Sequence, residues 1–356
     1  MLAGIAGCRA QVMEPVLWRP VVPSDIAVLG AGSWGTALAV HLARIGHAVR
    51  IWSIEAPIIA EMRERRANAV YLPDVALPEA VVPTTAIEDA LEGIDIAVAV
   101  VPSHAMRSVA RAARPFLAPG ATLVSAAKGL ELDTLQRMSE VLTQEAGGGH
   151  PVVAMSGPSF AIEVARELPT AISVASTDRA AARRVQEEFR GRSLRLYATT
   201  DVVGVEIGGA LKNVIAIAAG VAEGLGLGHN AQAALITRGL VEISRLAVAA
   251  GGRRETLAGL TGLGDLVLTC TGPYSRNRHV GVELAHGRVL SEVLAGMKMV
   301  AEGVKTTEAA VALGARHGVE LPITEQMAAV LDGRKTPRAA LEDLMLRPQR
   351  SEPEGG

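Results

Sequence analysis

A glycine-rich turn near the start of the chain places the strongest constraint on its fold. Residues 30–35 read GAGSWG, a G-x-G-x-x-G pattern that follows a short apolar run and precedes an Ala/Leu-rich segment. In a strand–turn–helix unit, Gly30 permits the tight turn, Gly32 lets the backbone approach a pyrophosphate, and Gly35 lets the helix pack closely on the sheet. Phosphate oxygens then bind the free N–H groups at the helix N-terminus. The pattern predicts dinucleotide binding, with an ordinary glycine-rich turn as the alternative.

Strand and helix patterns alternate over the first 200 residues. Apolar, β-branched runs are expected to form strands at 26–29, 49–52, 94–101, 122–125, 152–155, 170–174 and 194–197. Helical patterns lie between them at 36–45, 104–116, 132–144 and 179–189. Alternating elements of this kind predict an α/β fold with a doubly wound parallel sheet.

The composition changes after about residue 200. From there to residue 346 the chain is rich in Ala, Leu, Val and Gly at helical spacing, with breaks at 251–252, 271–273 and Pro322. We therefore expect a dinucleotide-binding domain at 24–200, followed by an all-helical substrate and catalytic domain at 201–346.

The two ends of the chain depart from these patterns. Residues 1–23 hold a short apolar start interrupted by charges and three prolines, without the order of regions found in a signal peptide. We interpret them as a loosely ordered extension, with either Met1 or Met13 as the start. Residues 347–356 are polar, and we expect a disordered tail there.

The charge balance and composition exclude several classes of protein. The 356 residues carry 35 Lys and Arg against 37 Asp and Glu, a formal net charge of −2, whereas nucleic-acid binders usually show a basic excess. Two cysteines are too few for a disulfide framework. No apolar run approaches the ~20 residues that cross a bilayer, and no ligand spacing indicates a metal site. We expect a cytoplasmic protein without a transmembrane segment, a nucleic-acid partner or a bound metal.

The end of the second predicted strand normally selects between NAD and NADP. An acid there binds the ribose 2′-hydroxyl of NAD, and a nearby Arg accepts the 2′-phosphate of NADP. Residues 51–55 read IWSIE, with neither an acid at the tip nor an Arg after it. Ser53 could bind either NAD or NADP. Glu55 fits the alternative of a solvated side chain. The choice between NAD and NADP stays open.

Unusual residues follow three later strands, in the segments VVPSH at 100–104, SAAKGLE at 125–131 and MSGPSF at 155–160. Open parallel sheets bind ligands beyond the carboxyl ends of their strands. Lys128 is therefore a candidate site residue, with a solvated loop lysine as the alternative. Gly157 and Ser159 are candidates too, although a turn with a helix N-cap has the same pattern.

The helical half carries a few polar residues in apolar surroundings. Burial of Lys212 would destabilise its charged form and suit it to proton transfer; alternatively, its stem carries the ammonium out to water. Asp265 needs a partner such as Lys212, or it caps a helix. Arg276 can bind phosphate through two N–H groups, with a solvated loop as the alternative. Glu302 is either a ligand contact or a capping or surface acid.

Seven motifs occur in order across both halves. They are GAGSWG at 30–35, AKGL at 127–130, SGPSF at 156–160, ALKNVI at 210–215, TGLGDL at 261–266, SRN at 275–277 and EG at 302–303. Together they resemble the bacterial NAD(P)-dependent glycerol-3-phosphate dehydrogenase family, over roughly residues 25–346. The resemblance implies a Rossmann-type N-terminal domain, a helical C-terminal domain and a homodimer. It also implies reversible hydride transfer between NAD(P)H and C2 of dihydroxyacetone phosphate, giving sn-glycerol 3-phosphate for glycerophospholipid synthesis.

The resemblance further implies roles for the matching residues. Lys212 is the expected catalytic residue, exchanging a proton with the C2 oxygen. The expected substrate-binding residues are Lys128, Gly157, Ser159, Lys212, Asp265, Ser275, Arg276 and Asn277. The expected cofactor-binding residues are Gly30, Gly32, Ser33, Trp34, Gly35, Ser53, Lys128, Ala161, Arg276, Val300 and Glu302. Ser53 departs from the basic or His residues that some members carry there, and residues 1–23 are not part of the usual pattern.

Two other functions compete with this interpretation. A hydroxyacid or ketopantoate-type dehydrogenase also combines a glycine turn with a Lys-Asn helix, although SGPSF and SRN suit a phosphate-bearing substrate better. A non-catalytic dinucleotide-sensing protein would bind the cofactor without turnover, and the pairing expected of Lys212 and Asp265 argues against it.

Overall fold

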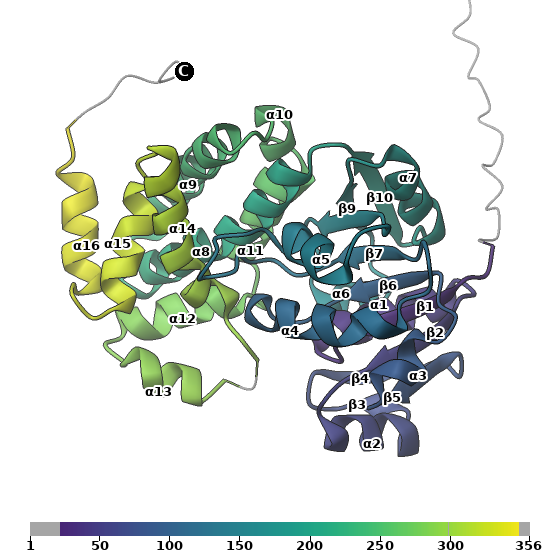
Figure 1. Ribbon diagram of the computed structural model, residues 1–356. Coiled ribbons are helices and arrows are strands. Elements are labelled where there is room, and N and C mark those ends of the chain that lie inside the picture. The colour runs from purple at the N-terminus through teal and green to yellow at the C-terminus, as the bar shows by residue number, and fades with distance from the viewer. Residues whose placement is uncertain (1–21, 298, 349–356) are drawn as a thin grey trace, which may run out of the picture.

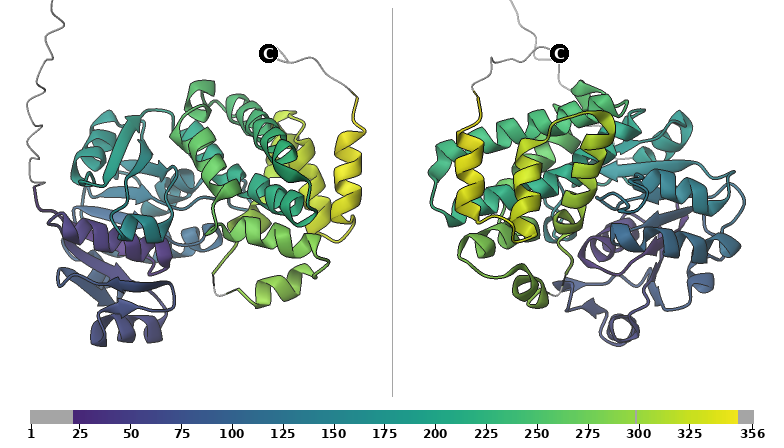
Figure 2. Two further views of the ribbon diagram at one scale, coloured as in Figure 1. Left: turned by 180° about the vertical axis from the view of Figure 1, so that it is seen from behind. Right: turned by 60° about the vertical axis from the view of Figure 1, so that its left-hand side comes forward.

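The computed structural model describes residues 22–297 and 299–348. A sheet with flanking helices forms the N-terminal half, and a bundle of helices forms the C-terminal half beside it (Figure 1). The last helices of the chain lie on the side of the bundle away from the sheet (Figure 2). The extension expected at 1–23 and the tail expected at 347–356 fall almost entirely outside the described residues.

An eight-stranded sheet forms the centre of the N-terminal half, in the order β10-β9-β8-β7-β6-β1-β2-β5. Its strands are β1 (Asp25–Leu29), β2 (Ala48–Trp52), β5 (Val81–Thr84), β6 (Ile96–Ala99), β7 (Thr122–Ser125), β8 (Val152–Ser156), β9 (Thr170–Ala175) and β10 (Leu194–Thr199). All seven predicted strands are present. Because β1 pairs in parallel with both β2 and β6, the strand order reverses at β1, and ligands of such sheets bind beyond its carboxyl end.

Two features of the sheet differ from the prediction. β9 pairs antiparallel with β8 and parallel with β10, so the sheet is mostly rather than wholly parallel. The prediction also lacks β5, which contains Pro83, and the small ladder of β3 (Ala67–Asn68) and β4 (Leu72–Ala76). An edge strand such as β5 tolerates proline because its outer N–H groups need no partner in the sheet.

Helices bury both faces of the sheet. They are α1 (Ser33–Arg44), α2 (Ala56–Glu64), α3 (Ile87–Leu91), α4 (Ser103–Ala113), a 3-10 turn (Arg114–Phe116), α5 (Met138–Ala146), α6 (Ala161–Ala165) and α7 (Arg179–Glu188). In β1, Ile26 and Val28 join the apolar cluster that includes α1 and α7, whereas Ala27 and Leu29 join the one that includes α3. This alternation is typical of a strand covered on both sides.

The helix expected at 132–144 begins later in the structure. Residues 127–137 form a loop that a bridge between Leu130 and Arg137 closes. α5 starts only after Arg137, whose backbone N–H donates to Glu140 Oε2 at 2.9 Å. The prediction is wrong at this end because the apolar residues of the loop mimic helical spacing. The loop carries Lys128 beyond the carboxyl end of β7.

The C-terminal half is helical, as predicted. It comprises α8 (Val202–Gly224), α9 (Gly228–Ala249), α10 (Arg254–Leu257), a π-helical turn (Leu260–Gly264), α11 (Asp265–Thr271), α12 (Arg276–Ala285), α13 (Leu290–Ala295), α14 (Glu302–His317), α15 (Pro322–Leu331) and α16 (Pro337–Met345). Among the described residues, α8 alone is long and apolar enough to cross a bilayer by length and composition, but 89% of that apolar window is buried within the fold. α8 is the central helix of the bundle.

Small residues let α12 pack tightly along α8. A Cβ at Gly220 of α8 would lie 1.9 Å from the carbonyl oxygen of Arg278, and a Cβ at Gly281 of α12 would lie 2.0 Å from that of Ile217. Such distances are far below a van der Waals contact, so side chains at these positions would force the helices apart. The close approach fixes the start of α12, which carries the SRN motif, against α8, which carries Lys212.

A buried carboxylate connects the two halves of the molecule. Glu206 of α8 accepts hydrogen bonds from the backbone N–H of Ser139 (2.8 Å), from Ser139 Oγ (2.5 Å) and from Arg137 Nη1 (2.8 Å), all at the start of α5. Burial raises the pKa of Glu206, and the Arg137 and Ser139 contacts oppose that rise. The carboxylate is therefore held by the partners that its burial requires.

Replacing Glu206 by alanine is expected to lower the free energy of unfolding by about 1–3 kcal/mol, because Ser139 loses its acceptor in a buried setting. Arg137 keeps Glu140 as a partner at 2.7 Å, which limits the loss. Urea denaturation measures the change. Glu283→Ala, which breaks the Glu283–Arg288 pair near the surface, is the control and should change stability by less than about 1 kcal/mol. Equal effects of the two substitutions would contradict the prediction.

Candidate functional site

The glycine turn lies at the point where the strand order of the sheet reverses. Gly30 has a φ of +123°, and its N–H donates to the carbonyl of Trp52 at 2.8 Å. A Cβ at Gly30 would lie 2.5 Å from Val100 O, and a Cβ at Gly35 would lie 1.9 Å from Gly30 O. At Gly32, by contrast, a Cβ would meet nothing within 4 Å, and α1 has no side-chain cap. Open space in front of an uncapped helix N-terminus fits the pyrophosphate of a dinucleotide.

Most of the other expected cofactor residues surround this turn. Ser33 and Trp34 begin α1, and Ser33 Oγ lies 2.6 Å from Tyr71 O and 2.8 Å from Met299 Sδ. Ser53 follows β2, and its side chain is buried. Its hydroxyl accepts a hydrogen bond from the backbone N–H of Glu55. Ala161 begins α6, which packs against α1.

The start of α14 reaches the same edge of the sheet. Glu302 accepts hydrogen bonds from the backbone N–H of Ser103 at 3.2 Å and from Ser103 Oγ at 2.6 Å. Because Ser103 begins α4, which follows β6, Glu302 caps a helix that starts beside the glycine turn. A Cβ at Gly129 would lie 2.9 Å from the Glu302 carboxylate. Val300 precedes this contact and is partly exposed. The helical half thus closes on the dinucleotide edge of the sheet.

Two lysines share one buried carboxylate between the halves. Lys212 Nζ donates to Asp265 Oδ1 at 2.8 Å, and Lys128 Nζ donates to Asp265 Oδ2 at 2.7 Å. Lys212 is 6% exposed and Asp265 is 1% exposed, so the ammonium of Lys212 does not reach out to water. Gly264, rather than Asp265, occupies the N-cap position of α11. The contact expected between Lys212 and Asp265 is present, and the second lysine gives the cluster a net positive charge.

The SGPSF segment joins this cluster through Lys128. Lys128 Nζ donates to Gly157 O at 2.8 Å and lies 3.5 Å from Ser159 Oγ. Ser159 Oγ in turn donates to Gly157 O at 2.9 Å. A glycine in α8 allows the approach, because a Cβ at Gly209 would lie 2.5 Å from Ser156 Oγ. The structure therefore brings together five of the expected substrate residues: Lys128, Gly157, Ser159, Lys212 and Asp265.

Thr269 belongs to the cluster and was missing from the sequence prediction. Its hydroxyl accepts a hydrogen bond from Lys212 Nζ at 2.7 Å and donates to the backbone carbonyl of Asp265 at 2.6 Å. An ammonium has three N–H groups. Lys212 directs two of them to Asp265 and Thr269, which leaves the third for a ligand. Thr269 follows Asp265 by one helical turn, a spacing that places both on the same face of α11.

A chain of amide groups fixes the cluster relative to α12 and α14. Asn213 Nδ2 donates to Lys128 O at 3.3 Å, and Asn277 Nδ2 donates to Asn213 Oδ1 at 2.9 Å. The backbone N–H of Gly303 donates to Asn277 Oδ1 at 2.9 Å. Asn277 therefore has both ends of its amide engaged within the protein. Its position suits a residue that holds its neighbours in place.

Ser275 is the N-cap of α12, and Arg276 is the first residue of this helix. Ser275 Oγ accepts a hydrogen bond from the N–H of Arg278 at 3.3 Å, so this side chain caps the helix. The Arg276 side chain is exposed to solvent, yet desolvation lowers its pKa, and the nearby Glu302 carboxylate opposes that effect. The guanidinium stays charged at neutral pH. Within residues 22–297 and 299–348, neither side chain hydrogen-bonds to Lys128, Lys212 or Asp265.

The surroundings of Lys212 tune its proton affinity. Desolvation lowers the pKa of Lys212 to about 8, the Asp265 carboxylate opposes this effect, and the Lys128 ammonium adds to it. Burial also raises the pKa of the neighbouring Cys270 thiol to about 12, so this group stays protonated. A proton donor or acceptor works best when its pKa is near the operating pH. Lys212 therefore meets the requirement for proton transfer in either direction.

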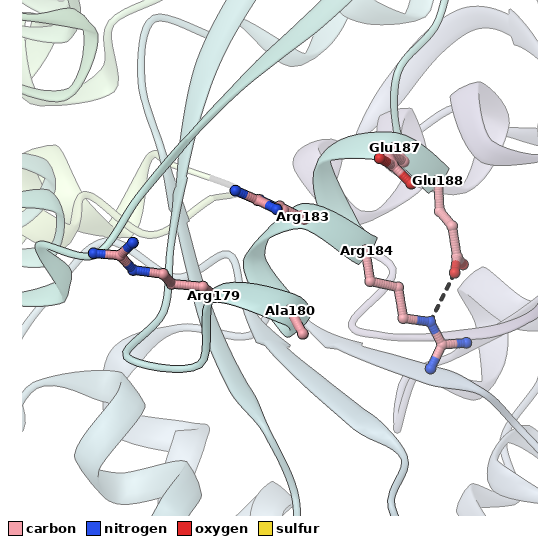
Figure 3. A pocket seen from close by; sticks show the side chains of 6 residues that line it. All are labelled: Arg179, Ala180, Arg183, Arg184, Glu187 and Glu188. Carbon is pink, nitrogen blue, oxygen red and sulfur yellow. Dashed lines mark hydrogen bonds and ion pairs between the residues drawn. The ribbon is translucent and has the colours of Figure 1, made fainter.

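An open hollow of about 560 Å³ lies away from this site, along α7. Arg179, Arg183, Arg184, Glu187 and Glu188 line it, and Arg184 forms an ion pair with Glu188 at 2.7 Å (Figure 3). It contains none of the expected site residues. In the part of the chain that the structure describes, no group of three or more His, Cys, Asp or Glu could hold a metal ion.

Comparison with known families decides the family of the chain. Residues 25–182 match the model of the NAD-dependent glycerol-3-phosphate dehydrogenase N-terminus, and residues 201–342 match that of its C-terminus. The chain belongs to this family. A glycerol-3-phosphate dehydrogenase (NAD(P)+) from Koribacter versatilis (strain Ellin345) is 54% identical over 333 residues, which cover 92% of this chain and 99% of the relative. A protein of the same name from Citrifermentans bemidjiense is 51% identical over 329 residues, which cover 92% of this chain and 98% of that relative.

A solved structure gives the same result. The crystal structure of glycerol-3-phosphate dehydrogenase from Coxiella burnetii matches with a TM-score of 0.88 and 42% identity, covering 91% of this chain and 99% of that one. The predicted fold class, a Rossmann-type sheet followed by a helical domain, is confirmed as that of the glycerol-3-phosphate dehydrogenase family.

Proposed function

We propose that this chain is an NAD(P)-dependent sn-glycerol-3-phosphate dehydrogenase, which reversibly reduces C2 of dihydroxyacetone phosphate. The relatives named above support the substrate. The observation that carries the proposal is the buried ammonium of Lys212, which has one N–H free of Asp265 and Thr269. We assign dinucleotide binding to residues 24–200 and the principal substrate and catalytic groups to residues 201–346.

Lys212 holds the proton that the C2 oxygen needs. Reduction of a ketone requires an acid at the carbonyl oxygen, and a positioned acid typically contributes ~10²–10⁴-fold to the rate. Asp265 and Thr269 orient the ammonium, so its third N–H is directed to the substrate oxygen. The glycine turn at 30–35 would hold the pyrophosphate of NAD(P)H, whose nicotinamide would supply the hydride. In the reverse direction, the neutral amine of Lys212 accepts the proton from the C2 hydroxyl.

The cationic groups around the cluster bind the phosphate. Lys128 and Lys212 together exceed the charge of Asp265, which makes the centre attractive to an anion. Arg276 contributes a guanidinium that is charged and open to solvent, and this group suits a phosphate dianion because it can donate two parallel hydrogen bonds. Asn277 supports the start of α12 through its bonds to Asn213 and Gly303. Arg276 is thus the phosphate anchor, and Asn277 is its positioning residue.

The pH dependence should follow the pKa of Lys212, which burial lowers to about 8. Below that pH Lys212 is protonated and able to act as an acid, so kcat/KM for ketone reduction should be high and should fall as pH rises through about 8. For alcohol oxidation, which needs the neutral amine, kcat/KM should fall as pH drops through the same value. Initial rates in both directions between pH 6 and 10 measure the two limbs. Profiles with the same sign in both directions would contradict the role of Lys212.

Arg276→Ala should raise the KM for dihydroxyacetone phosphate by about 10- to 100-fold and change kcat less, because hydrogen bonds to charged groups contribute ~1.5–3 kcal/mol. Arg278→Ala is the matched control on the same helix. Arg278 faces Glu223, at 2.6 Å, and should leave KM nearly unchanged. Steady-state kinetics of both variants test the assignment of Arg276 to the substrate phosphate. Equal changes of KM in the two variants would contradict it.

We propose further that the enzyme acts in the cytoplasm, as a homodimer, and supplies sn-glycerol 3-phosphate for glycerophospholipid synthesis. The naming of the bacterial relatives supports a role in glycerol phosphate metabolism. Sedimentation equilibrium tests the dimer: a mass of one chain at micromolar concentration would overturn it. Labelling of glycerophospholipids in cells that lack the protein tests the metabolic role, and unchanged labelling would argue against it.

A comparison of ketones tests the proposed function directly. NADH and NADPH are supplied separately with dihydroxyacetone phosphate, with dihydroxyacetone and with ketopantoate. We expect turnover with dihydroxyacetone phosphate and little with the two ketones that lack its phosphate. Turnover of ketopantoate alone would favour a hydroxyacid-type dehydrogenase. Binding of cofactor without turnover of any ketone would favour a non-catalytic sensor.

A further inference from the structure

Glu55 lies where this type of fold recognises the adenosine ribose of a dinucleotide. It occupies the N-cap position of α2 and comes 20 residues after Gly35, the spacing at which an acid binds the 2′-hydroxyl of NAD. β2 lies beside β1, with Trp52 paired to Leu29, and the N–H of Gly30 donates to Trp52 O at 2.8 Å. The end of β2 and the glycine turn are therefore direct neighbours.

Tyr71 connects Glu55 to the glycine turn. Its hydroxyl donates to Glu55 Oε1 at 2.8 Å, and its carbonyl oxygen lies 2.6 Å from Ser33 Oγ at the start of α1. Desolvation, with the Glu55 carboxylate adding to it, raises the pKa of Tyr71, so the phenol stays a donor. Tyr71 holds one carboxylate oxygen and leaves the other able to accept a ribose hydroxyl. Glu55 is exposed to solvent, as the alternative interpretation of the sequence expects, but this hydrogen bond also ties it to Tyr71.

The tip of β2 offers no cation to a phosphate group. Ile54 is 80% exposed, so the residue at the tip is apolar and open to solvent. The Ser53 hydroxyl is buried and accepts the N–H of Glu55 at 3.2 Å. Arg63 and Arg66 instead donate to carbonyl oxygens of β5, at 2.9 Å each. Across the described ranges, no lysine or arginine forms an ion pair with Glu55.

We propose that Glu55 accepts the adenosine 2′-hydroxyl and rejects a 2′-phosphate, so that this chain prefers NAD(H) to NADP(H). The inference rests on the proposed function, because it requires a dinucleotide at the glycine turn. A 2′-phosphate would place its negative charge against the Glu55 carboxylate, with no arginine at the tip to offset the repulsion. We expect the Kd for NADH to be about 10- to 100-fold lower than that for NADPH, the range that a hydrogen bond to a charged group supports.

Titration of the protein with NADH and with NADPH in the absence of ketone tests this preference without relying on activity. The fluorescence of the nicotinamide reports binding and gives the two Kd values. Glu55→Gln keeps an acceptor for Tyr71 and removes the charge, so NADPH should bind at least about fivefold more tightly and the NADH/NADPH ratio should shrink. Ile54→Arg places a guanidinium at an exposed position, so misfolding would not explain a change in nucleotide binding. This variant should favour NADPH further. Glu64→Gln, at the exposed far end of the same helix, removes an equal charge and should leave the ratio unchanged.

The outcomes separate this inference from the proposed function. Wild-type protein that binds NADPH as tightly as NADH, or a Glu55→Gln variant with an unchanged ratio, would overturn the role of Glu55 while leaving dinucleotide binding intact. Binding of neither nucleotide would overturn the proposed function and this inference together. A tenfold or larger NADH preference that Glu55→Gln and Ile54→Arg both reduce would support it.

Discussion

Lys212→Ala should lower kcat for the reduction of dihydroxyacetone phosphate by about 10²–10⁴-fold, the usual contribution of a positioned acid. The Kd for NADH should change little, because Lys212 contacts Asp265 and Thr269 and lies on α8, outside the glycine turn. The fold should persist, since Asp265 keeps Lys128 as its counter-charge at 2.7 Å. Steady-state kinetics and fluorescence titration measure the two quantities on the same preparation.

Two further variants make this prediction specific. Lys305→Ala removes an exposed lysine from α14 and should leave kcat unchanged. Lys212→Arg keeps a positive charge, but a guanidinium does not give up its proton in the working pH range, so it should not restore turnover. Wild-type kcat in Lys212→Ala, or full rescue by arginine, would show that Lys212 is not the proton donor.

Asp265→Asn is expected to affect both stability and the pH profile. The substitution keeps the shape of the side chain and removes the one carboxylate that two ammoniums share, at 2.7 and 2.8 Å. Breaking a buried ion pair by removing one partner costs about 3–5 kcal/mol, because the remaining charge is uncompensated. The negative charge of Asp265 also raises the pKa of Lys212, so its loss should lower that pKa further below about 8. The reduction limb of kcat/KM should then move to lower pH.

Urea denaturation and the pH profile of kcat/KM measure these two effects separately. Asp332→Asn is the control, since Asp332 pairs with Arg334 on the surface and should contribute less than about 1 kcal/mol. A variant that loses stability without a shift of the pH limb would assign Asp265 a purely structural role. A variant that changes neither would contradict the shared-carboxylate description of the cluster.

The sequence predicts those parts of the fold that depend on local pattern. Seven strands and the helical half follow from apolar spacing, and Pro322, which ends the preceding segment, lies in the first turn of α15. The pattern does not contain strand direction, so the antiparallel pairing of β9 with β8 could not be predicted. The prediction missed β5 because Pro83 weakens the strand pattern in the sequence, although proline does not prevent an edge strand.

The site was predictable where a residue needs a partner. A lone buried acid requires a cation, and this requirement correctly pairs Asp265 with Lys212. That Lys128 shares the same carboxylate depends on a loop 137 residues away in sequence, which no local pattern reveals. Thr269 could have been identified from its helical spacing to Asp265. The hydrogen bond between Tyr71 and Glu55 could not, because Tyr71 lies 16 residues further along the chain, in the turn between β3 and β4.

The most direct test of the account is a coupled measurement of substrate and cofactor in one reaction. Purified protein is mixed with NADH and dihydroxyacetone phosphate, NADH oxidation is followed at 340 nm, and the product is identified by NMR. We predict one sn-glycerol 3-phosphate formed for each NADH oxidised, with both signals lost in Lys212→Ala. NADH that binds but is not oxidised by the wild-type protein, or oxidation that persists at the wild-type rate in Lys212→Ala, would contradict the central claim.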